Sequence, residues 1–204
     1  MITIIDYGLG NVLAILNVYR RLNIPVIAAK SSADLVNVTK LILPGVGSFD
    51  HAMQQFEQSG MRQSVETLVF QKRIPLLGIC VGMQMLANSS DEGSLAGLGW
   101  IEGNVKRFDL TLMSTGSNLP HMGWNEVKPN VVGGLFAGME MGARFYFLHS
   151  YYYECLHQHN ILAVTDYGGL FSCALRKDNI YGVQFHPEKS HHFGSQLLKN
   201  FAEI

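Results

Sequence analysis

Residues 78–84, Gly78-Ile79-Cys80-Val81-Gly82-Met83-Gln84, decide how this sequence is interpreted. The apolar segment before them, residues 74–77, has the composition of a buried strand, and residues 83–87 resemble the start of a helix. A cysteine between a strand and a helix, with glycine two residues to either side, is typical of a nucleophile elbow, whose tight turn requires small neighbours. Such an elbow would hold the Cys80 sulfur at the carboxyl end of a sheet, above a helix N-terminus that favours a thiolate. For this stretch alone, a core cysteine among packing glycines is the alternative.

A second stretch, residues 180–188, supplies the other groups that a cysteine nucleophile needs. Its sequence, Ile-Tyr-Gly-Val-Gln-Phe-His-Pro-Glu, predicts a buried strand that ends at a histidine. Pro187 favours an extended conformation of the residue before it, so we expect His186 and Glu188 to share a face. His186 would serve as the base and Glu188 would orient it. A core histidine and a helix-terminal acid are the alternatives for each residue singly, but together with Cys80 they favour a catalytic triad.

The composition predicts one α/β domain over residues 1–204. The chain is 48% hydrophobic and 15% charged, which is enough apolar material for a substantial core. The net charge is −1 and no basic stripe is present, so we expect no nucleic-acid partner. No apolar run approaches the roughly 18 residues of a membrane span, and the start of the chain lacks the features of a signal peptide. We therefore expect a cytoplasmic protein without a membrane partner.

The remaining cysteines and histidines predict neither disulfides nor a metal site. Three cysteines, odd in number and widely spaced, do not form a disulfide framework. Cys155 and Cys173 lack the glycine elbow and a nearby base, so we expect them to be inert. The pairs His157/His159 and His191/His192 have no cysteine or carboxylate partner at a metal-site spacing. No metal and no cofactor are expected.

The order of predicted elements indicates a mostly parallel sheet that acquires antiparallel strands in the second half of the chain. Strands and helices alternate in the first half, which favours right-handed crossovers and helices on both faces. In the second half, short strands follow one another, and residues 177–179 predict a hairpin turn. The predicted strands are residues 2–5, 25–29, 41–43, 74–77, 105–108, 124–127, 144–148, 161–165 and 171–175. The predicted helical segments are residues 12–22, 34–36, 48–56, 60–71 and 194–202, with Asn11 and Ser48 as N-caps, and the predicted mobile loop is residues 111–119.

Two further segments suggest substrate contacts. Pro44-Gly45-Val46-Gly47 follows a predicted strand and should lie at the same sheet edge as Cys80. Its backbone amides, with the amide of Val81, would form an oxyanion hole, although a simple strand-to-helix turn explains the glycines equally well. In the aromatic segment 146–153, Ser150 and Tyr151 could hydrogen-bond a small polar substrate, while strand packing explains most of its other residues.

Taken together, these strings resemble the class I glutamine amidotransferases over nearly the whole chain. Within that family the resemblance is to the glutaminase subunits of imidazole glycerol phosphate synthase. The strings that carry it are Ile5-Asp6-Tyr7-Gly8 with Gly10-Asn11, Pro44-Gly45-Val46-Gly47, Gly78-Ile79-Cys80 with Gly82-Met83-Gln84, Pro120-His121-Met122-Gly123-Trp124-Asn125, and Gly182-Val183-Gln184-Phe185-His186-Pro187-Glu188-Lys189-Ser190. The resemblance implies a flavodoxin-like three-layer sandwich with a single glutaminase domain.

The resemblance also implies a reaction. The Cys80 thiolate would attack the side-chain amide carbon of L-glutamine. His186, oriented by Glu188, would protonate the departing ammonia and then activate water on the thioester. By matching position, the residues that would hold glutamine or its oxyanion are Gly45, Val46, Gly47, Val81, Gln84, Ser150 and Tyr151.

A partner is implied as well, because the chain has no room for a domain that uses ammonia. In the family, a (β/α)₈ barrel cyclase subunit docks over the glutaminase site as a heterodimer and receives the ammonia through a channel. Asn11, Met122, Trp124 and Lys189 match positions that face this partner. The resemblance implies low glutaminase activity until the partner is loaded, with residues 44–47 as the switch.

The ammonia acceptor stays open between two pathways. Residues 91–100 resemble paralogues that supply ammonia for an amidino sugar of surface polysaccharide, whereas the other strings favour histidine biosynthesis. Two other classes remain as alternatives: a cysteine hydrolase of a different amide or peptide, and a non-catalytic binding module. The strings around Gln84 and at residues 120–125 argue against the first, and the intact triad argues against the second.

Overall fold

The computed structural model describes residues 1–109, 111, 118–131, 133–139 and 141–204. The strands are β1 (Ile2–Ile5), β2 (Val26–Ala29), β3 (Lys40–Gly45), β4 (Leu76–Cys80), β5 (Ser89–Ser90), β6 (Gly103–Arg107), β7 (His121–Glu126), β8 (Lys128–Pro129), β9 (Arg144–His149), β10 (Tyr151–Cys155), β11 (Ile161–Asp166), β12 (Leu170–Lys177) and β13 (Ile180–Val183). The helices are α1 (Val12–Arg21), α2 (Phe49–Gln58), α3 (Arg62–Glu66), α4 (Val81–Gln84) and α5 (His191–Glu203), with short turns η1 (Ser32–Asp34), η2 (Thr67–Gln71), η3 (Gly134–Phe136), η4 (Gln158–Asn160) and η5 (Pro187–Lys189).

A parallel sheet forms the centre of the molecule. Strands β2, β1, β3, β4 and β13 are parallel neighbours in that order, and β12 then pairs antiparallel with β13. The sheet continues through β10, β6 and β5, while β11 and β8 branch from β12. This arrangement confirms the predicted change from parallel to antiparallel pairing in the second half. It also places the carboxyl ends of β3 and β4 side by side, with Gly45 opposite Cys80.

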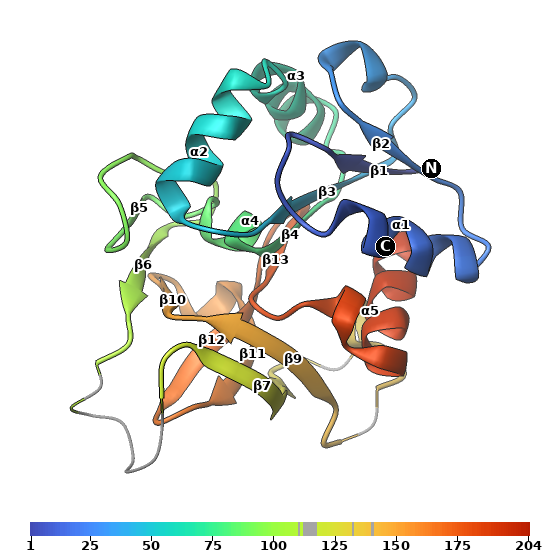
Figure 1. Ribbon diagram of the computed structural model, residues 1–204. Helices are drawn as coiled ribbons and strands as arrows, with labels where there is room; N and C mark the ends of the chain where they lie inside the picture. Colours follow the sequence, from blue (N-terminus) through green and yellow to red (C-terminus); the bar gives the residue numbers. More distant parts are fainter. Residues whose placement is uncertain (110, 112–117, 132, 140) are drawn as a thin grey trace.

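Helices cover both faces of the parallel strands, as the alternation of elements predicted. Helices α1 and α5 pack together on one face, and α2, α3 and α4 lie on the other (Figure 1). Strands β7 and β9 form a separate two-stranded antiparallel sheet beside the end of β4. Among the described helices, none is long and apolar enough to cross a membrane.

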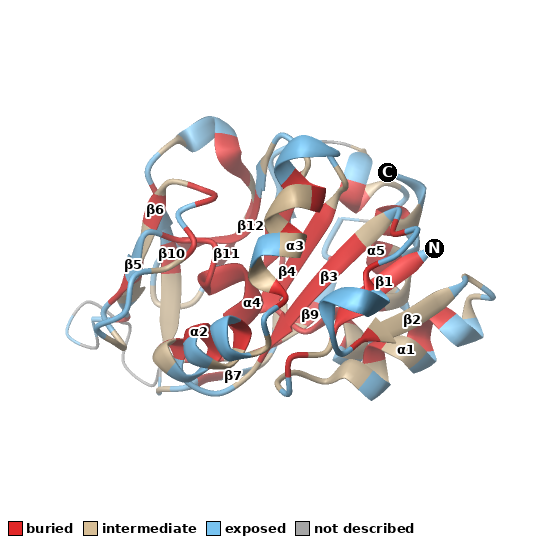
Figure 2. Cartoon of the chain, turned by 90° about the horizontal axis from the view of Figure 1, so that it is seen from above, coloured by how far each residue is buried: buried red, intermediate tan, exposed pale blue. Residues whose placement is uncertain are grey.

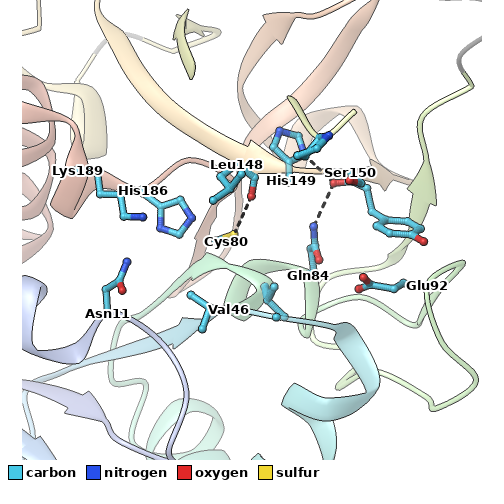
Figure 3. A pocket seen from close by; sticks show the side chains of 14 residues that line it. Asn11, Val46, Cys80, Gln84, Glu92, Leu148, His149, Ser150, His186 and Lys189 are labelled. Carbon is cyan, nitrogen blue, oxygen red and sulfur yellow. Dashed lines mark hydrogen bonds between the residues drawn. The ribbon is translucent and has the colours of Figure 1, made fainter. Parts of the chain in front are cut away.

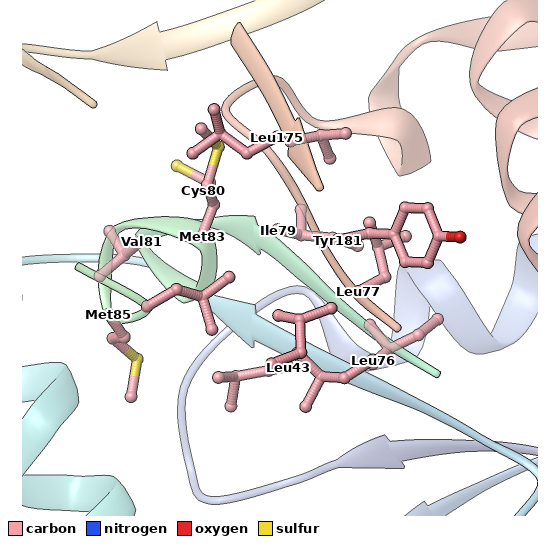
Figure 4. Packing of buried hydrophobic residues seen from close by; sticks show 14 of the residues in the cluster. Leu43, Leu76, Leu77, Ile79, Cys80, Val81, Met83, Met85, Leu175 and Tyr181 are labelled. Carbon is pink, nitrogen blue, oxygen red and sulfur yellow. The ribbon is translucent and has the colours of Figure 1, made fainter. Parts of the chain in front are cut away.

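The core lies between these layers. Every residue of β4 is buried, because both faces of this strand are covered (Figure 2). Beneath the elbow, Ile79 of β4 and Tyr181 of β13 are buried on one face of the sheet, and Leu43 of β3 is buried on the other (Figure 4). The strand that carries Cys80 is therefore buried along its whole length, which gives a reactive residue a rigid base.

The elbow has the tight turn that its glycine spacing predicted, and its backbone is strained. Cys80 has φ 56° and ψ −114°, a combination that costs a non-glycine residue about 1–3 kcal/mol. A Cβ atom at Gly78 would lie 2.7 Å from the carbonyl oxygen of Gly82, and one at Gly82 would lie 2.0 Å from that of Leu43. Only glycine fits at both positions. The helix that follows, α4, ends at Gln84 and is shorter than the predicted segment to residue 87.

Several local predictions were wrong or incomplete. The predicted helix at residues 34–36 is the single turn η1, two residues earlier, and α5 begins at His191 rather than at residue 194. The aromatic segment 146–153 contributes to two strands, β9 and β10, and the second was not predicted. Residues 177–179 do connect the β12–β13 hairpin. Residues 112–117 of the predicted mobile loop lie outside the described residues.

Candidate active site

His186 and Glu188 meet as predicted, but they do so across the turn η5 and not along an extended chain. The imidazole Nδ1 lies 2.8 Å from Glu188 Oε1, and the two side chains are 4% and 1% exposed. Pro187 begins the turn η5, so His186 is the last extended residue after β13. The two residues therefore form a hydrogen-bonded pair that is almost completely removed from water.

The environment of this pair favours an imidazolium beside a carboxylate. Burial lowers the pKa of His186, but hydrogen bonding and charge from Cys80 and Glu188 outweigh burial and raise the pKa to about 10. Burial raises the pKa of Glu188, but the hydrogen bond and charge of His186, together with a hydrogen bond from Asn11, hold it below its ordinary value. The charged forms of the two groups thus support each other.

Asn11 contributes to this pair directly. Its Nδ2 donates a hydrogen bond of 2.8 Å to Glu188 Oε1, the same oxygen that His186 contacts. Asn11 occupies the N-cap position of α1 as predicted, but its side chain caps no backbone amide there. Its amide is used instead to hold the carboxylate in place.

Cys80 lies beside His186 at the end of β4 (Figure 3). Its sulfhydryl donates to the carbonyl of Leu148 at 3.9 Å, and its sulfur accepts a hydrogen bond of 3.8 Å from Gln184 Nε2. The residue is only 4% exposed. The remaining two cysteines, Cys155 and Cys173, are buried elsewhere, and burial raises the pKa of both thiols, as expected for inert cysteines.

A cavity of about 470 Å³ opens above the sulfur. The predicted site residues that line it are Asn11, Val46, Gly47, Cys80, Val81, Gln84, Ser150, Tyr151, His186 and Lys189. Glu188 does not line the cavity itself, but it contacts two residues that do, His186 and Asn11. Two of the four predicted partner-facing residues lie outside the cavity: Met122 and Trp124 are 65% and 38% exposed on β7.

The loop at residues 44–47 packs directly on the elbow. A Cβ atom at Gly45 would lie 2.4 Å from the amide nitrogen of Gly82 and 2.8 Å from the carbonyl carbon of Val81, so glycine is required. Gly47 has φ +86°, a conformation that favours glycine. This close packing brings Val46 and Val81 to one wall of the cavity.

One known protein family matches a range of the chain that includes all of these site residues. Residues 3–204 match the family model described as "Glutamine amidotransferase class-I". The chain belongs to the class I glutamine amidotransferases.

Curated relatives of this amidotransferase align over its full length. It is 59% identical to "Imidazole glycerol phosphate synthase subunit HisH" of Bdellovibrio bacteriovorus and 50% identical to the protein of the same name of Leptospira interrogans, each covering 100% of both chains. It is 44% identical, again over 100% of both chains, to "Imidazole glycerol phosphate synthase subunit HisH 2" of Pseudomonas aeruginosa. Among solved structures, a glutamine amidotransferase matches with a TM-score of 0.76 and 19% identity, covering 99% of this chain and 97% of that chain, which confirms the fold.

The side-chain amide of Gln84 in this amidotransferase is fixed by two hydrogen bonds to other parts of the chain. Its Nε2 donates to the carbonyl of Tyr151 and to Gln184 Oε1, each at 3.1 Å. A primary amide has two N–H donors, so both are occupied. Its Oε1 remains as the atom with which Gln84 would contact a substrate.

The contributors to the site that were not predicted include Gln184, Glu92 and His149, together with Leu148 and Pro120 in the cavity wall. Gln184 is fully buried just after the end of β13, and its Nε2 reaches the sulfur of Cys80. Glu92 lines the cavity, and its Oε2 accepts a hydrogen bond of 2.8 Å from the amide of Phe49 at the start of α2, where Ser48 was the predicted cap. His149 lines the cavity from the end of β9.

The histidines considered for metal binding have other roles. His157 pairs with Glu102, and His191 stacks on Trp124 with ring centroids 5.0 Å apart. Within the described ranges, no group of three His, Cys, Asp or Glu residues is placed to hold a metal ion.

Proposed function

We infer that the protein hydrolyses L-glutamine to glutamate and ammonia as the glutaminase subunit of imidazole glycerol phosphate synthase in histidine biosynthesis. Family membership supports the glutamine chemistry, and the names of the full-length relatives support the histidine pathway over the amidino-sugar pathway. The observation that carries the mechanism is the buried His186–Glu188 pair beside Cys80.

In the proposed reaction, Cys80 is the nucleophile. Its thiolate attacks the amide carbon of glutamine, and His186 donates its proton to the leaving nitrogen, so that ammonia departs and a thioester remains. His186, now neutral, takes a proton from water, the hydroxide attacks the thioester, and glutamate is released with the sulfur restored as thiolate. Glu188 stabilises the imidazolium in both steps. The amides of the 44–47 loop and of Val81 stabilise the oxyanion.

The charges around the cavity fit a free amino acid. Glu92 places a carboxylate in the cavity wall, and only its Oε2 is used at the start of α2, so the other oxygen is available for the α-ammonium group of glutamine. Lys189 lines the same cavity with a positive charge suited to the α-carboxylate. A peptide bond has neither terminal charge near the scissile group. This pairing of charges therefore favours glutamine over the alternative of a peptide substrate.

The proposal includes a partner. Ammonia that escapes into water is protonated and lost as a nucleophile, so an acceptor site must lie close to the cavity. The relatives are named as subunits of a synthase, which supports a cyclase subunit as that partner. We place a (β/α)₈ barrel cyclase over the cavity mouth, against Met122, Trp124, Asn11 and Lys189. A cytoplasmic location follows from this biosynthetic role.

The test is glutamate release by the full chain, alone and co-purified with the cyclase subunit. We expect glutamine hydrolysis that rises strongly when the loaded cyclase is bound. Cys80→Ala should abolish hydrolysis, while Cys155→Ala, the matched control, should keep it. Hydrolysis by the Cys80 variant, or turnover of peptides in preference to glutamine, would refute the proposal.

A further inference from the structure

His121 has no role in the reaction above, although it belongs to the segment 120–125 that carries the resemblance. It lies on β7 directly opposite His149 on β9. Its ring is 3% exposed and lies between the rings of Tyr167 and Phe147, with centroid distances of 3.8 and 4.7 Å. Such a sandwich explains why a flat ring is present. It does not explain why the ring carries nitrogen atoms.

The hydrogen bonds assign a proton to one nitrogen of each ring. His149 Nδ1 lies 2.8 Å from the carbonyl oxygen of Tyr151, which only accepts, so Nδ1 must donate. Burial lowers the pKa of His149 to about 3 and that of His121 to about 4, so both rings are neutral at pH 7. Neutral His149 must then accept at Nε2, and the donor is His121 Nδ1 at 3.0 Å.

The chain of hydrogen bonds continues to the nucleophile. The carbonyl of Tyr151 accepts a second hydrogen bond from Gln84 Nε2 (Figure 3). Gln84 also donates to Gln184, which donates to the sulfur of Cys80. The carbonyl that His149 contacts is therefore the junction between the histidine pair and the amides at the sulfur.

We propose that His121 is a positioning residue for glutamine hydrolysis, which acts by fixing the donor nitrogen of His149 against the backbone at residues 149–151. This inference rests on the proposed function, because Ser150 and Tyr151 are the residues assigned to hold glutamine. If His121 stops donating, His149 Nε2 becomes a buried acceptor without a partner, and the ring is free to turn and release Tyr151. Residues 149–151 then shift relative to the Cys80 sulfur, although Cys80, His186 and Glu188 keep their own contacts.

Two substitutions separate this role from simple packing. His121→Phe keeps a ring between Tyr167 and Phe147 but removes the donor. His121→Asn loses the ring but can place an amide nitrogen where Nδ1 lies. For the full chain bound to its cyclase, we expect the Phe variant to raise the KM for glutamine roughly tenfold, the effect of one lost buried hydrogen bond, with a smaller change in kcat. The Asn variant should stay within about threefold of the parent KM, because the donor is restored.

The opposite order would overturn the proposal: a Phe variant with the parent KM, or an Asn variant with the larger KM defect, would mean that His121 only fills space. A loss of folded protein is distinguished because it lowers the apparent kcat at unchanged KM. Imidazole ¹⁵N shifts of the parent protein provide a test that needs no variant. Neutral rings with Nδ1 protonated in both His121 and His149 support the proposal, and a His149 protonated at Nε2 refutes it. This readout is independent of glutamine turnover, so its failure is distinct from a failure of the proposed function.

Discussion

Glu188→Gln removes the charge of the proposed triad while preserving its shape. In the parent protein, a single oxygen, Oε1, accepts both from His186 Nδ1 and from Asn11 Nδ2. The other oxygen, Oε2, is buried without a hydrogen-bond partner. A glutamine can therefore keep both hydrogen bonds through its own Oε1 and place its amide nitrogen where Oε2 lies. The substitution isolates the electrostatic contribution of the carboxylate.

The magnitude follows from the distance between the two groups. An imidazolium and a carboxylate whose charges are roughly 4 Å apart interact by about 4 kcal/mol at an effective dielectric constant of about 20. If the imidazolium is required to protonate the leaving ammonia, kcat should fall by about 10³-fold. Because Glu188 helps to raise the pKa of His186 to about 10, its replacement lowers that pKa. The imidazolium is then lost at lower pH, so the alkaline limb of the rate profile should move to lower pH.

The assay is glutamate release by the cyclase-bound chain between pH 6 and 10, with KM measured at each pH. Asn11→Leu is the matched comparison, because it removes one hydrogen bond to the same oxygen and leaves the charge. We expect it to lower kcat by about tenfold. A Glu188→Gln enzyme within about threefold of the parent kcat, with its alkaline limb unmoved, would refute the electrostatic role of Glu188.

Two further predictions concern the sulfur and the exposed face. Gln184→Leu removes the donor to Cys80 and the acceptor of Gln84, so kcat for glutamine hydrolysis should fall by about tenfold; an unchanged kcat would contradict this. Met122→Asp introduces a charge on the proposed partner face and should abolish co-purification with the cyclase, whereas Met141→Asp, at an even more exposed methionine that does not line the cavity, should not. Equal effects of the two charges would argue against the assigned face.

Sequence reasoning predicted the parts of the site that depend on local geometry. The glycine spacing around Cys80 requires a tight turn, and the structure has no room for a side chain at Gly78 or Gly82. His186 and Glu188 also meet, although across the turn η5 and not along the extended chain that was predicted. In both cases the prediction rests on residues within a few positions of each other, and such spacings can be recognised in the sequence.

Contacts between distant segments were not predictable in the same way. Ser48 and Asn11 have the residue types of helix caps and stand at the cap positions, yet neither side chain makes a capping hydrogen bond. The carboxylate of Glu92 reaches the start of α2 instead, and Glu188 engages Asn11 across 177 positions of sequence. Helix-capping propensity says which residue types suit a cap position. It does not account for a side chain from a distant part of the sequence, such as Glu92 or Glu188, that forms the hydrogen bond instead.

Two unfavourable features of the structure lie at the proposed catalytic groups. Among the described residues, only Thr3 and Glu188 have a buried side-chain polar atom without a hydrogen-bond partner, and such an atom costs about 1–3 kcal/mol. Cys80 adds a strained backbone, and the carboxylate of Glu188 is withdrawn from water with only part of its hydrogen-bonding capacity used. A chain selected for stability alone would replace this buried pair with apolar side chains. The cost is compatible with folding because β4 and β13 pack so completely beneath the site that their core over-determines its geometry, and this rigidity is also what a preorganised triad requires.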